Sequence, residues 1–83
     1  MKILYFSWLK EKVGKSLEEI EKPKEVHSIK DLIEFLKNNS NKHQNAFKYP
    51  KSIKVAVNRD FADFETLINE EDEIAFFPPV TGG

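Results

Sequence analysis

Six residues at the end of the chain, Pro78-Pro79-Val80-Thr81-Gly82-Gly83, offer the most distinctive chemistry in the sequence. Neither proline has an N–H to donate to a β-ladder, so the pair ends any strand that precedes it. The two glycines lack a Cβ, so their backbone can enter a narrow space. The Thr81 hydroxyl is the one reactive side-chain group in these six residues. We therefore expect such a tail to present its own α-carboxylate, which an outside enzyme can activate.

A carboxylate at Gly83 is ionised at neutral pH and is a poor electrophile, because its ordinary pKa is about 3.3–3.7. It becomes reactive once a leaving group such as AMP is attached to it. The sequence contains no Gly-rich phosphate-binding loop. We therefore expect no cofactor bound by this chain, and ATP used by a separate activating enzyme. Fully extended, the six residues reach about 20 Å, far enough to enter a site on a neighbouring protein.

The composition describes one small domain without cysteine chemistry. Its 83 residues carry 13 Lys and Arg against 14 Asp and Glu, a net charge of −1. This balance does not favour nucleic acid or an anionic membrane as a partner, and no stretch approaches the roughly 18 apolar residues of a membrane helix. The chain has no cysteine, which excludes disulfides, thiol catalysis and Cys-ligated zinc. We expect a cytoplasmic protein with no metal site.

Hydrophobic periodicity predicts the elements that must position the tail. Alternating or continuous apolar residues predict strands over 2–7, 16–21, 53–57, 61–63 and 74–77. Helical spacing predicts helices over 8–13, about 28–38 and, more weakly, 41–48, with a helical turn over 66–69. Ser28 is suited to be the N-cap of the longest helix, with Asp31 in its first turn. Gly14 is suited to the left-handed end of the first helix.

This order of elements predicts an α+β domain of the β-grasp (ubiquitin-like) type. A hairpin, a long crossing helix and a returning hairpin form a mixed sheet in which helices cover one face. The first and last strands are both apolar, so we expect them side by side in the centre of the sheet. Residues 1–77 would form the β-grasp domain, and residues 78–83 a flexible, extended C-terminal tail.

The last twelve residues, Asp72-Glu73-Ile74-Ala75-Phe76-Phe77-Pro78-Pro79-Val80-Thr81-Gly82-Gly83, carry a close resemblance to a known family. They resemble the small subunits of molybdopterin synthase, which are ubiquitin-like sulfur carriers. The segments Lys2–Phe6 and Glu11–Gly14 are also similar to that family, as is the pair Val57-Asn58. Lys12 and Trp8 depart from the residues usual in the family, and neither belongs to the tail.

The resemblance implies a sulfur carrier that is activated at its C-terminus. In that family an E1-like enzyme adenylates the terminal glycine with ATP, and a sulfur donor converts the adenylate to a thiocarboxylate. Gly83 would then be the reactive residue. The segment that inserts into the large subunit would comprise Pro78, Pro79, Val80, Thr81 and Gly82.

The resemblance also implies where the sulfur goes. The ionised thiocarboxylate would deliver it to cyclic pyranopterin monophosphate, which builds the dithiolene of molybdopterin. Two carriers would bind a dimer of large subunits as a heterotetramer. The active site would lie on the large subunit, so this chain would be a sulfur-donating subunit without catalytic groups of its own.

Phenylalanines form a second candidate site. The inner face of the two central strands is expected to carry Ile3, Tyr5, Ile74 and Phe76. Strand alternation then puts Phe6 and Phe77 on the outer face of adjacent strands, where Phe61 can join them. Any single phenylalanine is more often part of the core, but three together predict an exposed partner-binding patch. The resemblance implies a partner surface in the same place.

Charged and histidine side chains carry less specific signals. The acidic loop Glu70–Glu73 would either steer the carrier toward a basic partner surface around the tail entrance or be an ordinary solvated loop. His27 and His43 lie among polar residues, so we interpret both as surface residues and neither as a ligand or a base.

Other functions remain open on these residues. A ubiquitin-like modifier, whose terminal glycine forms an isopeptide bond with target lysines, shares the fold and the Gly-Gly end. A sulfur carrier of the thiamine type is a nearer relative, but its tail lacks the Phe-Phe-Pro-Pro-Val-Thr segment. A passive interaction domain with an inert tail is the third alternative.

Overall fold

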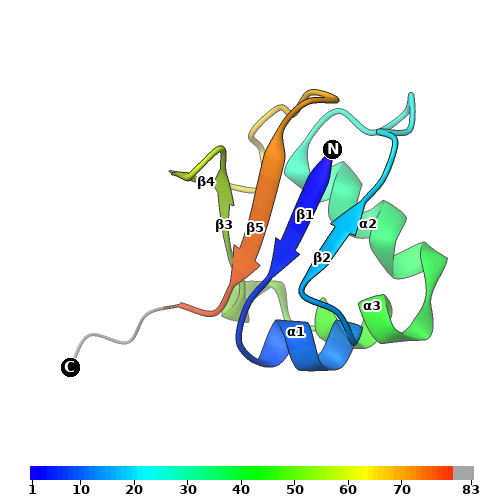
Figure 1. Ribbon diagram of the computed structural model, residues 1–83, viewed down its shortest axis with the longest axis vertical. Helices are drawn as coiled ribbons and strands as arrows, with labels where there is room; N and C mark the ends of the chain where they lie inside the picture. Colours follow the sequence, from blue (N-terminus) through cyan, green and yellow to red (C-terminus); the bar gives the residue numbers. More distant parts are fainter. Residues whose placement is uncertain (80–83) are drawn as a thin grey trace.

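Five strands and three α-helices form from residues 1–79, the part of the chain that the computed structural model describes (Figure 1). The strands are β1 (Lys2–Tyr5), β2 (Leu17–Glu19), β3 (Lys54–Val57), β4 (Asp60–Ala62) and β5 (Glu73–Phe77). The helices are α1 (Trp8–Val13), α2 (Ile29–Asn39), α3 (Asn41–Ala46) and the short 3-10 helix η1 (Pro50–Ser52). Within the described residues, no helix is long and apolar enough to cross a membrane.

The sheet has the strand order β2-β1-β5-β3-β4. The first and last strands lie side by side in its centre and run parallel, with Tyr5 opposite Phe76. The two hairpins flank this pair, since β2 is antiparallel to β1, and β3 is antiparallel to both β5 and β4. The predicted mixed α+β, β-grasp arrangement is therefore confirmed.

A capping box starts α2 where the sequence predicts it. The Ser28 hydroxyl accepts a hydrogen bond from the Asp31 N–H at 3.2 Å, and an Asp31 carboxylate oxygen accepts from the Ser28 N–H at 3.2 Å. A backbone N–H of His27 lowers the pKa of the Asp31 carboxyl, and the backbone N–H and hydroxyl of Ser28 lower it further. These bonds satisfy N–H groups that the first turn of a helix otherwise leaves unpaired.

Replacing Ser28 by alanine should lower the free energy of unfolding by about 1 kcal/mol, because the box loses its hydroxyl acceptor. Urea unfolding of the wild type and the variant measures this difference. Ser52→Ala is the matched control, since Ser52 is an exposed serine in η1. Equal losses in the two variants would contradict the role of the cap.

The core lies between the sheet and the helices that cover one of its faces. The predicted inner-face residues Ile3, Tyr5, Ile74 and Phe76 are all buried. They form one cluster with the apolar stripe of α2, namely Ile29, Leu32, Ile33 and Leu36. At the end of α3, the Phe47 ring meets the Phe76 ring edge-on, with ring centroids 4.9 Å apart. This aromatic contact anchors the end of β5 that leads into the tail.

The predicted helical turn over 66–69 is wrong, because this segment pairs with the chain that leads into α2. Leu67 forms an isolated β-bridge with Ser28. The Ile29 N–H donates to the Thr66 carbonyl at 3.0 Å, and the Ile68 N–H donates to the His27 carbonyl at 2.9 Å. These long-range bonds hold the segment extended and leave Ile68 buried and Leu67 exposed.

Candidate functional site

The tail root, which we define as Phe77, Pro78 and Pro79, continues directly from the central strand β5. Phe77 is held on one side by Lys54 of β3. On the other side, the Phe6 N–H donates to the Phe76 carbonyl at 3.1 Å. The two prolines follow at once, as predicted, and cannot extend the ladder. The predicted tail residues Val80, Thr81, Gly82 and Gly83 lie outside the described residues, so their roles stay predictions.

The face of the sheet that points away from the core carries a continuous apolar row. The cross-strand register pairs one small or apolar residue of each strand with one small or apolar residue of the neighbouring strand. Across the sheet the row runs Leu17, Leu4, Ala75, Ala56 and Phe61. The two central alanines make a low floor between bulkier side chains at the two edges. We call this row, together with Phe6 and Phe77, the open-face patch.

The three predicted phenylalanines all reach the surface of this patch. Phe61 is 87% exposed and Phe6 is 49% exposed, whereas Phe77 is half-buried. The structure brings Phe61 and Phe77 together, with ring centroids 6.0 Å apart. Phe6 follows the last residue of β1, Tyr5, which pairs with Phe76 of the neighbouring strand β5. Exposure is confirmed for Phe6 and Phe61 but only in part for Phe77, and the role of all three in partner binding stays a prediction.

A shallow hollow of about 350 Å³ lies beside the tail root. It is lined by Lys54, Val55, Phe61, Ala62 and Phe77. Its walls are mainly apolar, and Lys54 supplies one cation at the rim. An aromatic or aliphatic side chain of a partner fits such a hollow, because burial against two phenylalanine rings removes apolar area from water on both molecules.

The acidic loop lies at the other end of β5 from the tail root (Figure 1). Glu73 begins the strand and Phe77 ends it, so four steps along the strand separate the two by about 13 Å. Glu70 accepts a hydrogen bond from the Lys22 N–H at 2.6 Å, and Asp72 accepts one from the Asn69 N–H at 2.7 Å. These contacts favour a structural role for the loop over steering at the tail entrance.

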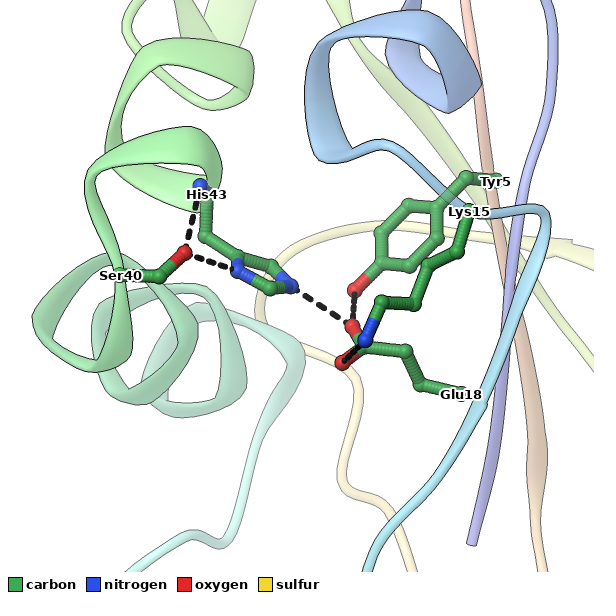
Figure 2. A network of polar contacts seen from close by, with 5 residues as sticks. All are labelled: Tyr5, Lys15, Glu18, Ser40 and His43. Carbon is green, nitrogen blue, oxygen red and sulfur yellow. Dashed lines mark hydrogen bonds and ion pairs between the residues drawn. The ribbon is translucent and has the colours of Figure 1, made fainter.

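His43 is buried, so its interpretation as a surface residue is wrong; His27 is exposed as predicted. The His43 ring joins a polar network with Tyr5, Lys15, Glu18 and Ser40 (Figure 2). One oxygen of Glu18, Oε2, lies 2.6 Å from the Tyr5 hydroxyl and 2.6 Å from His43 Nε2. The other oxygen, Oε1, lies 3.4 Å from Lys15 Nζ. The network ties β1, β2 and α3 together.

Burial and hydrogen bonding act on the two acidic groups of this network in opposite directions. Burial raises the pKa of the Tyr5 hydroxyl far above its ordinary value, and the adjacent Glu18 carboxylate raises it further. Burial alone would also raise the pKa of the Glu18 carboxyl. Hydrogen bonds from Tyr5 and His43, with the charges of His43 and Lys15, outweigh the effect of burial, and the pKa of the Glu18 carboxyl is lowered. Glu18 is therefore held as a carboxylate that accepts hydrogen bonds.

Acid should weaken this protein in part through Glu18. Because its pKa is lower in the folded chain than in the unfolded chain, Glu18 contributes stability above its ordinary pKa of about 4.3. That contribution disappears as the pH falls through the lower, folded-state value. The difference in unfolding free energy between wild type and Glu18→Gln should therefore shrink below about pH 5. Urea titrations followed by Trp8 fluorescence measure it, and a constant difference down to acid pH would contradict the assignment.

Comparison with known proteins places the whole chain in one family. The model of the ThiS family matches residues 3–83. The molybdopterin synthase sulfur carrier subunits of Escherichia coli and Haemophilus influenzae are each 31% identical to this chain over 83 residues. The match covers 100% of this chain and 99% of each relative.

Solved structures agree with the fold. A Pyrococcus furiosus protein assigned to molybdopterin converting factor subunit 1 superposes with a TM-score of 0.75 at 30% identity, covering 95% of both chains. Small archaeal modifier protein 1 of Haloferax volcanii superposes with a TM-score of 0.74 at 22% identity, covering 96% of this chain and 97% of its own; at this identity the likeness shows the fold alone. The family model and the full-length relatives together show that this chain belongs to the ThiS family.

Proposed function

We propose that this chain is the sulfur carrier subunit of a molybdopterin synthase. The observation that carries the proposal is the full-length relationship to sulfur carrier subunits of that enzyme, at 31% identity. The geometry supports it, because Pro78 and Pro79 follow directly from β5, a central strand of the sheet. An aromatic pair, exposed Phe61 and half-buried Phe77, lies at that same strand end, where a partner that receives the tail would dock.

The chemistry proposed for the tail takes place at Gly83. The terminal carboxylate attacks the α-phosphorus of ATP, pyrophosphate leaves, and an acyl-adenylate forms. Sulfur at the oxidation level of sulfide, supplied by a donor, then attacks the acyl carbon and displaces AMP, which leaves a thiocarboxylate. This group resembles a thiolate in being an ionised sulfur nucleophile at neutral pH. Its sulfur bonds to a carbon of cyclic pyranopterin monophosphate, and water then cleaves the acyl C–S bond, which regenerates the Gly83 carboxylate and leaves the sulfur for the dithiolene of molybdopterin.

The partners supply the catalytic groups in this proposal. An E1-like enzyme binds ATP and forms the adenylate, since the chain has no phosphate-binding loop of its own. The large synthase subunit receives the tail and holds the precursor. Two carriers and two large subunits form a heterotetramer. The chain itself binds no cofactor, and the surface of its domain is what both partner proteins bind.

Intact-mass spectrometry of the full chain tests the proposal. We expect incubation with ATP, the E1-like enzyme and a sulfur donor to give the mass increase of one oxygen replaced by sulfur. Adding the large subunit and the pyranopterin precursor should return the original mass. The same mixture without ATP is the control. A chain that keeps its original mass throughout would overturn the proposal, and a chain joined to lysines of other proteins would establish the modifier function instead.

A further inference from the structure

We propose that Glu18 is a positioning residue that acts through Tyr5. It holds the adjoining ends of β1 and β5, from which Phe6 and the tail root project. The effect on docking rests on the proposed function above, whereas the effect on the strand ends rests on contacts within the chain. The residue lies on the core side of edge strand β2, so it acts without touching a partner on the open-face patch.

Tyr5 is placed to control the end of β5. It is the last residue of β1 and is directly opposite Phe76 in the parallel pair. Its ring stacks on the Phe76 ring, with centroids 6.2 Å apart and planes 19° apart. Just beyond this pair, the Phe6 N–H donates to the Phe76 carbonyl. A shift of the Tyr5 ring would therefore displace both Phe76 and the last link between the two strands.

Glu18 fixes Tyr5 because the tyrosine hydroxyl is buried and needs an acceptor. Tyr5 is 1% exposed, and Glu18 Oε2 lies 2.6 Å from its hydroxyl oxygen. Within the described part of the chain, no buried polar side-chain atom lacks a partner. Loss of the Glu18 acceptor would leave a buried O–H unpaired, which is more costly than the net gain from an ordinary hydrogen bond.

The carboxylate is held in turn by α3. His43 Nε2 lies 2.6 Å from Glu18 Oε2, and His43 Nδ1 lies 2.5 Å from the Ser40 hydroxyl oxygen. Ser40 is the N-cap of α3, and its hydroxyl also accepts from the His43 backbone N–H at 3.0 Å. The ring is therefore fixed from both sides, as Figure 2 shows.

The proton positions make Glu18 the group on which the network depends. Oε2 accepts hydrogen bonds from the Tyr5 hydroxyl and from His43 Nε2–H. On the other side of the ring, the Ser40 hydroxyl can donate a hydrogen bond to Nδ1. A side chain without an oxygen at position 18 leaves two donors unpaired at once.

Amide hydrogen exchange of the full chain tests the hold on the strand ends. In Glu18→Leu, we expect the Phe6 N–H to exchange about tenfold faster than in the wild type. This factor is counted relative to any acceleration of the Leu32 N–H in the core of α2, which reports global opening. Glu18→Gln should recover most of the protection, because its amide oxygen still accepts. Glu19→Leu is the matched control, since Glu19 is exposed and points to the opposite face of the same strand. It should leave Phe6 unchanged.

Two further variants and measurements decide the interpretation. In a Tyr5→Phe background, which removes the hydroxyl, Glu18→Leu should accelerate Phe6 exchange far less. Docking to the large synthase subunit, measured where every variant is folded, should weaken in Glu18→Leu and recover in Glu18→Gln. Unchanged Phe6 exchange, an equal change in Glu19→Leu, or faster exchange with unaltered docking would overturn the proposal. A wild-type chain that fails to dock overturns the proposed function instead, and exchange at Phe6 still decides the hold on the strands.

Discussion

Deleting Gly83 should abolish sulfur loading while the domain stays folded and still docks. The shortened chain retains a terminal carboxylate, now on Gly82, but that carboxylate falls short by about 3.5 Å of chain. Adenylation requires the attacking oxygen to lie close to the phosphorus in an aligned geometry, so a displacement of this size removes the reaction. Intact-mass measurements with ATP, the E1-like enzyme and a sulfur donor give the loaded fraction.

The docking surface provides the internal control for this deletion. The open-face patch and the tail root are unchanged, so the dissociation constant of the large subunit should stay within a few-fold of the wild-type value. Gly83→Ala, which keeps both the length and the carboxylate, separates reach from the need for glycine. Sulfur loading of the deletion variant at the wild-type level would contradict the assignment of Gly83 as the reactive residue.

Local sequence patterns were sufficient to predict most of the fold. Helical spacing from Ile29 to Leu36 and the serine and aspartate at its start predict α2 to within a residue, and both ends of the capping box are present. Strand alternation correctly separates buried Ile3 and Ile74 from outward residues. These features depend on neighbours within a few positions, which a sequence displays directly.

The features that the sequence did not reveal depend on contacts between distant segments. His43 stands among polar neighbours in the sequence, but its ring is buried and its Nε2 contacts Glu18, which is 25 residues away. The segment at Leu67 becomes extended because it pairs with Ser28. The apolar row of the open-face patch needs the register of four strand pairs, which alternation within single strands does not fix. The predicted phenylalanine patch was therefore correct in the exposure of Phe6 and Phe61, overstated the exposure of Phe77, and was incomplete in its extent.

Phe61 should contribute more to docking than any other exposed side chain of comparable size. It is 87% exposed on the edge strand β4 and contacts the Phe77 ring beside the tail root. A partner that encloses the tail root would desolvate both rings together, and aromatic residues in such positions dominate binding energies. Phe61→Asp should weaken docking to the large subunit by about 2 kcal/mol, or roughly thirtyfold.

Leu67→Asp separates this effect from a general loss of surface hydrophobicity. Leu67 is 74% exposed, but it lies in the segment that pairs with Ser28, which precedes α2. Both variants exchange an exposed apolar side chain for a carboxylate, so both should unfold at nearly the wild-type urea concentration. Calorimetric titration should then show weak docking for Phe61→Asp alone. Equal weakening in both variants would mean that net charge governs association, since each change adds the same charge. A loss of affinity confined to Phe61→Asp instead assigns the binding energy to the aromatic pair that Phe61 forms with Phe77 of the tail root.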